Sequence, residues 1–240
     1  MIKKIKRVFN ELKVNQTKII AQNNELLWSS IFHDSIKGKP HLENLSLNIG
    51  RWAGNYAFFY VLNRILNDYQ PKRILEFGLG ESSKFVSTFL EHELPSSNHL
   101  IIEQSEDWKE SFGMRFKLFK NSQVLVCPLE QRMIQGFASN FYKDLDIVVD
   151  GVFDLYIVDG PFGSKNFSRY DIVDMMQRVD QNNEFIIIFD DFNRKGEKDT
   201  FNALLDLFKE KNITIYTANY SGDKDVMVLG TEKYKFITTL

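Results

Sequence analysis

The chain has 240 residues, enough for one large domain or two small ones. Thirty basic and thirty-two acidic side chains give a formal net charge of −2 at pH 7, so no strong overall field attracts nucleic acid. Hydrophobic residues make up 43% and charged residues 26%, which excludes disorder, collagen and a coiled coil as descriptions of the whole chain.

The single cysteine, Cys127, excludes an internal disulfide framework and favours a reducing compartment. The histidines show no ligand spacing with it, which argues against a structural zinc site. The longest apolar run, Phe185–Phe189, is far shorter than the roughly 18–20 residues of a spanning helix, and the N-terminus lacks the apolar stretch of a signal peptide. We therefore expect a cytoplasmic protein without stable membrane insertion and without a nucleic-acid partner.

Residues 1–65 form the first predicted unit, a helical N-terminal extension with breaks near Pro40 and Gly50. Apolar residues such as Phe9 and Leu12 recur at helical spacing beside several lysines in its first turns. Packing on the protein's own domain or on a partner, such as a second copy in a homo-oligomer, is the favoured interpretation. A helix lying on a membrane surface is the alternative.

Residues 66–240 form the second predicted unit, one α/β domain. Short β-rich apolar runs alternate with amphipathic stretches, as in βα units around a mostly parallel sheet. Only Asn219–Lys224 separates the last two strands, too few residues for a parallel crossover, so these strands must form an antiparallel hairpin. The predicted strands are 73–79, 99–104, 123–128, 153–159, 185–191, 213–218 and 225–230, and the predicted helices are 82–92, 108–117, 169–179 and 195–211.

The first strand of this domain ends in a glycine turn, in which Gly78 and Gly80 let the backbone bend tightly and approach a ligand. Ser83 stands where a dinucleotide fingerprint has its third glycine, and Glu76 would bring a carboxylate near the phosphates, so both argue against NAD. The second strand ends in Glu103, which can accept hydrogen bonds from the ribose hydroxyls of a nucleoside. An ordinary strand–helix turn and a solvated strand end are the alternatives.

The run Leu75-Glu76-Phe77-Gly78-Leu79-Gly80, followed by Ile101-Ile102-Glu103, resembles the nucleoside-binding half of class I S-adenosylmethionine-dependent methyltransferases. The closing hairpin resembles the last two strands of that family. The resemblance implies a Rossmann-like class I methyltransferase fold, a mostly parallel seven-stranded sheet with an antiparallel C-terminal hairpin, and S-adenosylmethionine as cofactor. It places Glu76, Gly78, Gly80 and Ser82 beside the methionine and ribose, Glu103 at the ribose hydroxyls, Pro128–Glu130 near the adenine, and Asp159 at the end of the cofactor site.

The ends of the fourth and fifth predicted strands indicate which methyltransferases the chain resembles most. Asp159-Gly160-Pro161 and Asp191-x-x-Arg194 are similar to methyltransferases that O-methylate uronic acids in polysaccharides, of the glucuronoxylan 4-O-methyltransferase type. Asp190 replaces the histidine that precedes the paired acid in the plant members, which moves the site towards metal-dependent small-molecule O-methyltransferases. The expected acceptor is therefore a hydroxyl of a sugar, a uronic acid or another small molecule.

A divalent metal site is predicted at Asp159, Asp190 and Asp191, because the ends of neighbouring parallel strands bring these carboxylates together. An all-oxygen set suits Mg²⁺, Mn²⁺ or Ca²⁺, which would lower the pKa of the acceptor hydroxyl. Two points stand against it: neighbouring strand residues begin on opposite faces, and one aspartate can instead cap the following helix.

The predicted catalytic residues are Asp159, Lys165 as a candidate base, and Arg194 as a clamp on a substrate carboxylate. Arg169 is a second candidate for the clamp, although a surface position in the first turn of a helix is the favoured interpretation. Trp52 and the residues just before it either cover the cofactor or pack locally. Two other functions stay open: an NAD-dependent oxidoreductase, and a non-catalytic binding or scaffold member of the same fold.

Overall fold

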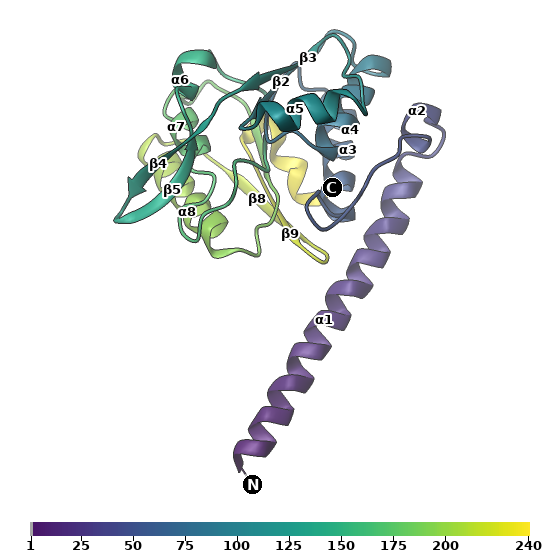
Figure 1. Cartoon of the computed structure of the whole chain (residues 1–240), viewed down its shortest axis with the longest axis vertical. Helices are drawn as coiled ribbons and strands as arrows, with labels where there is room; N and C mark the ends of the chain where they lie inside the picture. Colours follow the sequence, from purple (N-terminus) through teal and green to yellow (C-terminus); the bar gives the residue numbers. More distant parts are fainter. Residues whose placement is uncertain (1) are drawn as a thin grey trace.

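A seven-stranded sheet forms the centre of the protein, as shown by a computed structural model that describes residues 2–240 and side chains from residue 6 onward (Figure 1). The strand order is β3-β2-β1-β6-β7-β9-β8. The first five strands in this order run parallel, whereas β9 is antiparallel to both β7 and β8. The predicted fold class and the antiparallel hairpin are confirmed. The strands of this sheet are β1 (Arg73–Phe77), β2 (Asn98–Glu103), β3 (Ser122–Val126), β6 (Leu155–Val158), β7 (Ile186–Phe189), β8 (Tyr216–Ser221) and β9 (Asp225–Gly230).

Helices cover both faces of the sheet, because the central strands are apolar on both sides, as strands of parallel sheets are. One face packs against α3, α4 and the end of α1, and the other packs against α6, α7 and α8. The helices are α1 (Ile2–Ser35), α2 (Pro40–Glu43), α3 (Tyr56–Tyr69), α4 (Glu81–His92), α5 (Glu106–Gly113), α6 (Leu145–Val148), α7 (Asp171–Met176), α8 (Lys195–Glu210) and the 3₁₀ segment η1 (Glu232–Thr239).

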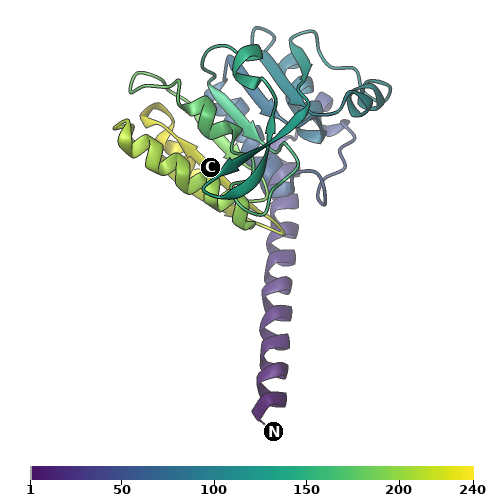
Figure 2. The same cartoon turned by 60° about the vertical axis from the view of Figure 1, so that its left-hand side comes forward.

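The long helix α1 leaves the body of the molecule and carries the N-terminus far from it, as both ribbon views show (Figure 2). Residues 6–20 are all exposed, whereas Phe32 near the C-terminal end of α1 is buried in the core. The predicted boundary between residues 65 and 66 falls inside α3, whose apolar residues belong to the same core as the sheet. Among the described residues, no helix is both long and apolar enough to cross a membrane.

The sequence pattern missed a second, two-stranded sheet, formed by β4 (Leu129–Ile134) and β5 (Phe137–Tyr142). Its two-residue turn has positive φ at both Gln135 and Gly136, the geometry of a type I′ hairpin. Glutamine is not one of the residues that usually mark such a turn. The hairpin packs against the loop after β6, where Asn140 N donates to Ser164 Oγ over 3.0 Å.

Candidate active site

The glycine turn after β1 lies at the carboxyl edge of the sheet. Gly78 has a φ of +100°, and a Cβ on it would lie 3.3 Å from the backbone nitrogen of Gly160 at the end of β6. The positive φ, which strains any residue with a side chain, and this tight approach of the two backbones together explain glycine at position 78. A Cβ on Gly80, in contrast, would meet nothing within 4 Å, so space is open on that side of the turn.

Glu103 stands at the end of β2 beside this turn and is 4% exposed. Its Oε2 accepts a hydrogen bond from Leu79 N, and its Oε1 accepts from the backbone nitrogens of Gln104 and Ser105. A carboxylate offers about four acceptor positions, so about one is left for a ribose hydroxyl. The open space at Gly80 and this acceptor fit the ribose part of a nucleoside cofactor.

Two predicted cofactor residues, Glu76 and Ser82, lie away from the open edge of the sheet. Glu76 is fully buried in the sheet, where its carboxylate accepts hydrogen bonds from Ser82 Oγ and from His99 Nε2, the latter over 2.8 Å. Both carboxylate oxygens of Glu76 therefore have partners inside the protein, and Ser82 is buried with them. Strand alternation turns Glu76 towards α4, away from the open edge, so these two side chains hold α4 to β1.

Side chains also partly close the open edge. Trp108 Nε1 donates to Leu79 O over 2.7 Å, and Phe162 N donates to Gln104 Oε1 over 3.2 Å, joining the ends of β2 and β6. Two surface hollows, of about 620 and 460 Å³, lie beside α1, and Leu47 and Ile49 also line the second.

Three carboxylates meet where β6 and β7 end. One oxygen from each of Asp159, Asp190 and Asp191 lies within 4.8 Å of the others. Because β7 ends at Phe189, the two neighbouring aspartates lie beyond the regular strand, and Asp191 has a left-handed backbone with φ of 59°. Side chains alternate between the two faces of the sheet only within a strand, so Asp190 and Asp191 are not forced to opposite faces. The structure therefore brings the three predicted residues together.

Lys224 supplies the first counter-charge to this cluster. It lies in the turn between β8 and β9, with its Nζ 2.7 Å from Asp190 Oδ2 and 3.1 Å from Asp191 Oδ1. Asp190 is 0% exposed, and the Lys224 side chain is 11% exposed. Arg194 adds a second counter-charge at the surface, with Nη1 3.0 Å from Asp191 Oδ2.

Arg169 supplies the third counter-charge, and the expectation that it lies on the surface is wrong. The side chain is 4% exposed, and its Nη2 lies 3.1 Å from both Asp159 Oδ1 and Asp191 Oδ2. Its Nη1 donates to the backbone oxygen of Asp190 over 3.0 Å. The loop after β6 folds inward before α7 begins, so Arg169 ties the ends of β6 and β7 together.

Burial and these ion pairs shift the pKa values of the carboxylates in different directions. Burial, with help from Asp190, raises the pKa of Asp159 to about 8. Burial also raises the pKa of Asp190, although Lys224 opposes the shift. For Asp191, burial alone would raise the pKa, but Lys224 and Arg169 hold it below its usual value. Asp191 therefore stays ionised near neutral pH, whereas Asp159 can exchange a proton there.

A divalent metal does not fit this cluster as it stands. The three oxygen donors suit a hard cation, but Lys224, Arg169 and Arg194 already neutralise the carboxylates. A cation bound between Asp190 and Asp191 would have to displace the Lys224 ammonium from its contacts with both residues.

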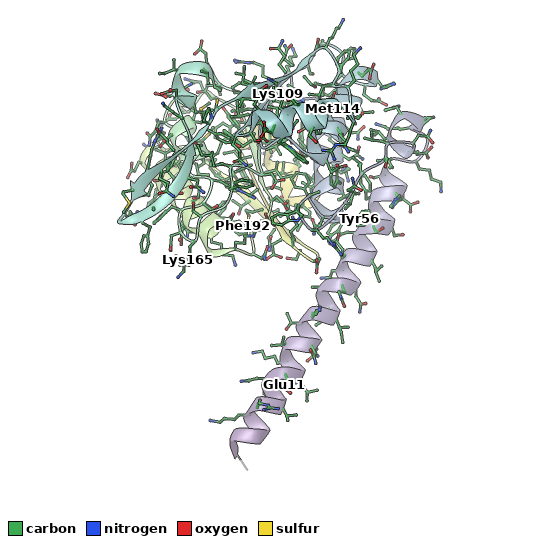
Figure 3. The ribbon with its side chains drawn as sticks, in the orientation of Figure 1. Glu11, Tyr56, Lys109, Met114, Lys165 and Phe192 are labelled. Carbon is green, nitrogen blue, oxygen red and sulfur yellow. The ribbon has the colours of Figure 1, made fainter. Side chains whose placement is uncertain are left out.

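The remaining predicted residues lie further out. Lys165 is exposed at the outer edge of the molecule (Figure 3), whereas Arg194 is half-exposed beside Asp191. Trp52 is 92% exposed, so it does not pack locally. Asn48, a few residues earlier, donates its backbone N–H to Glu81 at the start of α4 over 3.0 Å, which places this segment beside the glycine turn.

Comparisons with known proteins support the fold. No family model matches the chain, and no curated protein matches it. Among solved structures, the chain is similar to the O-methyltransferase TomG from Streptomyces achromogenes, which is involved in tomaymycin synthesis and was solved in complex with SAM. The two share 12% identity over 89% of this chain and 98% of that chain, with a TM-score of 0.53. It is also similar to an O-methyltransferase from Bacillus cereus solved in complex with SAH, at 10% identity over 90% of this chain and 100% of that chain, with a TM-score of 0.50. Because such identities establish the fold alone, the conclusion from topology and comparison together is that this chain has the Rossmann-like fold of class I methyltransferases.

Proposed function

We propose that the protein is an S-adenosylmethionine-dependent O-methyltransferase acting on a hydroxyl of a uronic acid, another sugar or another small molecule. The observation that carries the proposal is the joining of two sites at one edge of the sheet. Leu79 N donates to Glu103, which links the glycine turn to the acid on β2, and Asp159 N donates to Phe77 O over 3.1 Å, which links the turn to the carboxylate cluster. A cofactor beside the turn is then next to a group that can accept a proton.

In this proposal the chain binds the cofactor mainly through its backbone and one carboxylate. The open side of Gly80 admits the ligand, and the remaining acceptor position of Glu103 takes a ribose hydroxyl. S-adenosylmethionine supplies an electrophilic methyl group. The protein's task is then to hold the acceptor oxygen in line with that group and to remove its proton.

Asp159 is the proposed base. Its side chain is 19% exposed, it stands at the end of β6 next to the glycine turn, and burial raises its pKa to about 8. A base works best when its pKa lies near the working pH. Arg169 fixes one oxygen of this carboxylate at 3.1 Å, which orients the group. Lys165, the other predicted base, is exposed at the edge of the molecule and is the weaker candidate.

Lys224 and Arg169 neutralise the three carboxylates, as a divalent cation was expected to do. Lys224 donates one N–H to Asp190 Oδ2 and stays charged, because Asp190 and Asp191 raise its pKa against the effect of burial. A second donor faces Asp191 Oδ1 at 3.1 Å, and the third is left to stabilise negative charge on the acceptor oxygen. The proposed reaction is therefore independent of added metal, and a metal-assisted reaction is the alternative.

Arg194 supports an acceptor that carries a carboxylate. Its guanidinium is half-exposed, and within the described part of the chain its one ion pair is between Nη1 and Asp191. The remaining planar donors can bind a carboxylate bidentately, as in a uronic acid. Mass spectrometry of uronic-acid glycans and catechols incubated with the enzyme tests this preference. Arg194→Gln should raise KM for the acidic acceptor while leaving KM for a neutral one unchanged.

Calorimetry with S-adenosylhomocysteine tests the cofactor site. The wild-type protein should bind it and should not bind NAD. Gly80→Val should abolish binding without loss of stability, because φ is −164° there and the side chain would fill open space. Gly78→Val is the poorer test, because a φ of +100° strains any side chain at that position. Binding of NAD alone would favour an oxidoreductase, and binding of neither ligand would favour a scaffold.

A further inference from the structure

We propose that the part of α1 that projects from the body binds the surface of an anionic lipid bilayer and attaches the protein to it. This part of the helix projects from the body with every residue from 6 to 20 exposed, and Figure 3 shows Glu11 far from the sheet. In proteins most helical stability comes from packing of an amphipathic face, so a surface that covers this exposed part of the helix is expected.

The exposed apolar side chains of α1 gather on one side of the helix. At roughly 100° per residue, Phe9, Leu12 and Ile19 fall within about 80° of one another. They are 67%, 62% and 56% exposed. Val8, Ile20, Leu26 and Leu27 lie on the same side, so these seven residues form one stripe, which we call the apolar stripe of α1.

The apolar stripe is distinct from the side of α1 that packs on the body. Trp28, Ile31 and Phe32 make that contact, with Trp28 Nε1 donating to Ser221 O over 3.0 Å. On the same helical projection, the centre of this packing side lies roughly 130° from the centre of the apolar stripe. Docking of α1 through its packing side therefore leaves the stripe uncovered.

The charge of the first twenty residues favours an anionic lipid surface, and not a second copy of the chain, as the partner of the apolar stripe. The first twenty residues hold six basic side chains and one acidic side chain, although the whole chain has a net charge of −2. A parallel pair of these helices would bring two strongly basic segments together, whereas an anionic lipid surface attracts them. A stripe of Phe, Leu and Ile with lysines along the helix is the composition of helices that lie in a membrane interface.

Co-sedimentation with vesicles tests the proposal on the full chain. The protein should pellet with vesicles of phosphatidylcholine plus phosphatidylglycerol, much less with phosphatidylcholine alone, and less at high salt because surface charges are screened. Leu12→Glu and Ile19→Glu should each lower the bound fraction several-fold. Val14→Glu is the matched control, because Val14 is equally exposed at 65% but lies off the stripe.

Val14→Glu should bind nearly as well as the wild type, and all three variants should unfold at the wild-type midpoint, since each site is exposed. No vesicle binding by the wild type, or equal loss in the Val14 variant, would overturn the proposal. A concentration-dependent dimer in analytical ultracentrifugation that Leu12→Glu abolishes, without vesicle binding, would assign the stripe to a second copy instead.

Discussion

Asp190 is buried completely beside Asp191, and the structure compensates these carboxylates with Lys224 and Arg169. Buried ion pairs cost desolvation, but removing one partner costs more, because the other charge stays buried and unpaired. The geometry therefore couples the stability of the fold to the electrostatics of the proposed active site.

Lys224→Met should destabilise the protein by about 3–5 kcal/mol, because Asp190 would be left buried without its cation. Mn²⁺ should then restore part of this loss, since the three carboxylates lie close enough to hold an ion once the ammonium is gone. Thermal unfolding and Mn²⁺ electron paramagnetic resonance measure the two effects. Lys224→Arg, which keeps the charge, is the matched control and should gain no Mn²⁺ affinity.

The wild-type protein should show no tight Mn²⁺ binding, and its methyl transfer should survive EDTA. Micromolar Mn²⁺ binding by the wild type would show that the ion displaces Lys224, and would restore the metal hypothesis. The binding measurement does not depend on turnover, so it needs no methyl acceptor.

Asp171, the first residue of α7, should make stability fall as pH rises. Burial raises its pKa to about 7 from 3.8, its Oδ1 accepts from Tyr142 N, and its Oδ2 is buried with no hydrogen-bond partner among the described residues. The folded state therefore holds this proton more tightly than the unfolded state. The resulting stability is fully present below about pH 4 and is lost as pH rises through about 7.

Asp171→Asn keeps the acceptor for Tyr142 N but has no proton to lose. By roughly 1.4 kcal/mol per pKa unit, the variant should gain up to a few kcal/mol over the wild type at about pH 8 and only roughly 1.5 kcal/mol at about pH 5. Urea unfolding at both values measures the difference. Equal pH dependence in the two proteins would show that Asp171 is not protonated in the folded state near neutrality.

At the scale of elements, α1 holds the turn that carries Lys224. Glu25 of α1 accepts hydrogen bonds from Tyr56 N over 2.7 Å, and from Asn55 Nδ2 and Asp223 N over 2.9 Å each. Gly222 passes so close to Glu25 that a Cβ there would overlap the carboxylate. One carboxylate thus joins α1, the start of α3 and the β8–β9 turn.

Glu25→Ala should cost about 1.5–3 kcal/mol, the range for hydrogen bonds to a charged group, in urea unfolding. It should also lower kcat, because the loosened turn no longer fixes Lys224. Glu11→Ala is the matched control: Glu11 is exposed on the same helix and pairs only with Arg7 among the described residues, so its loss should change stability by less than about 0.5 kcal/mol. Equal effects of the two substitutions would contradict the assigned role of Glu25.

At the scale of the whole molecule, α1 has two parts with different roles. Residues 6–20 contact solvent, whereas Phe32, Ile36 and Leu42 from the same N-terminal extension are each 5% exposed or less and belong to the central core. The second half of the N-terminal extension is therefore part of the folded body, where it helps to cover one face of the sheet.

A chain that starts at residue 21 should keep the wild-type unfolding free energy within about 0.5 kcal/mol, and should lose vesicle binding. A chain that starts at Leu45 should be unfolded or severely destabilised, because burying each large apolar side chain contributes about 1.5–3 kcal/mol and total stability is only about 5–15 kcal/mol. Circular dichroism and urea unfolding of both chains measure the contrast. A stable fold starting at Leu45 would mean that α3 alone completes that face of the sheet.

Local pattern and chain connectivity are enough to predict most of the fold. The alternation of apolar runs and amphipathic stretches predicted the seven strands of the main sheet, and the short Asn219–Lys224 connection required an antiparallel hairpin. The bend at Gly78 and the meeting of three aspartates at the ends of β6 and β7 also follow from strand ends and neighbouring strands. Such features depend on residues close in sequence or on strands whose order the connectivity limits.

Only the tertiary structure decided which charges pair. Lys224 and Asp190 are 34 positions apart, and Glu25 and Asp223 are 198 apart, so no local pattern predicts either contact. The turn away from the surface that buries Arg169, and the pairing of Glu76 with His99 inside the sheet, likewise depend on how distant segments pack. A charged residue looks the same in sequence whether it is solvated or paired, and burial against distant partners decides between the two states.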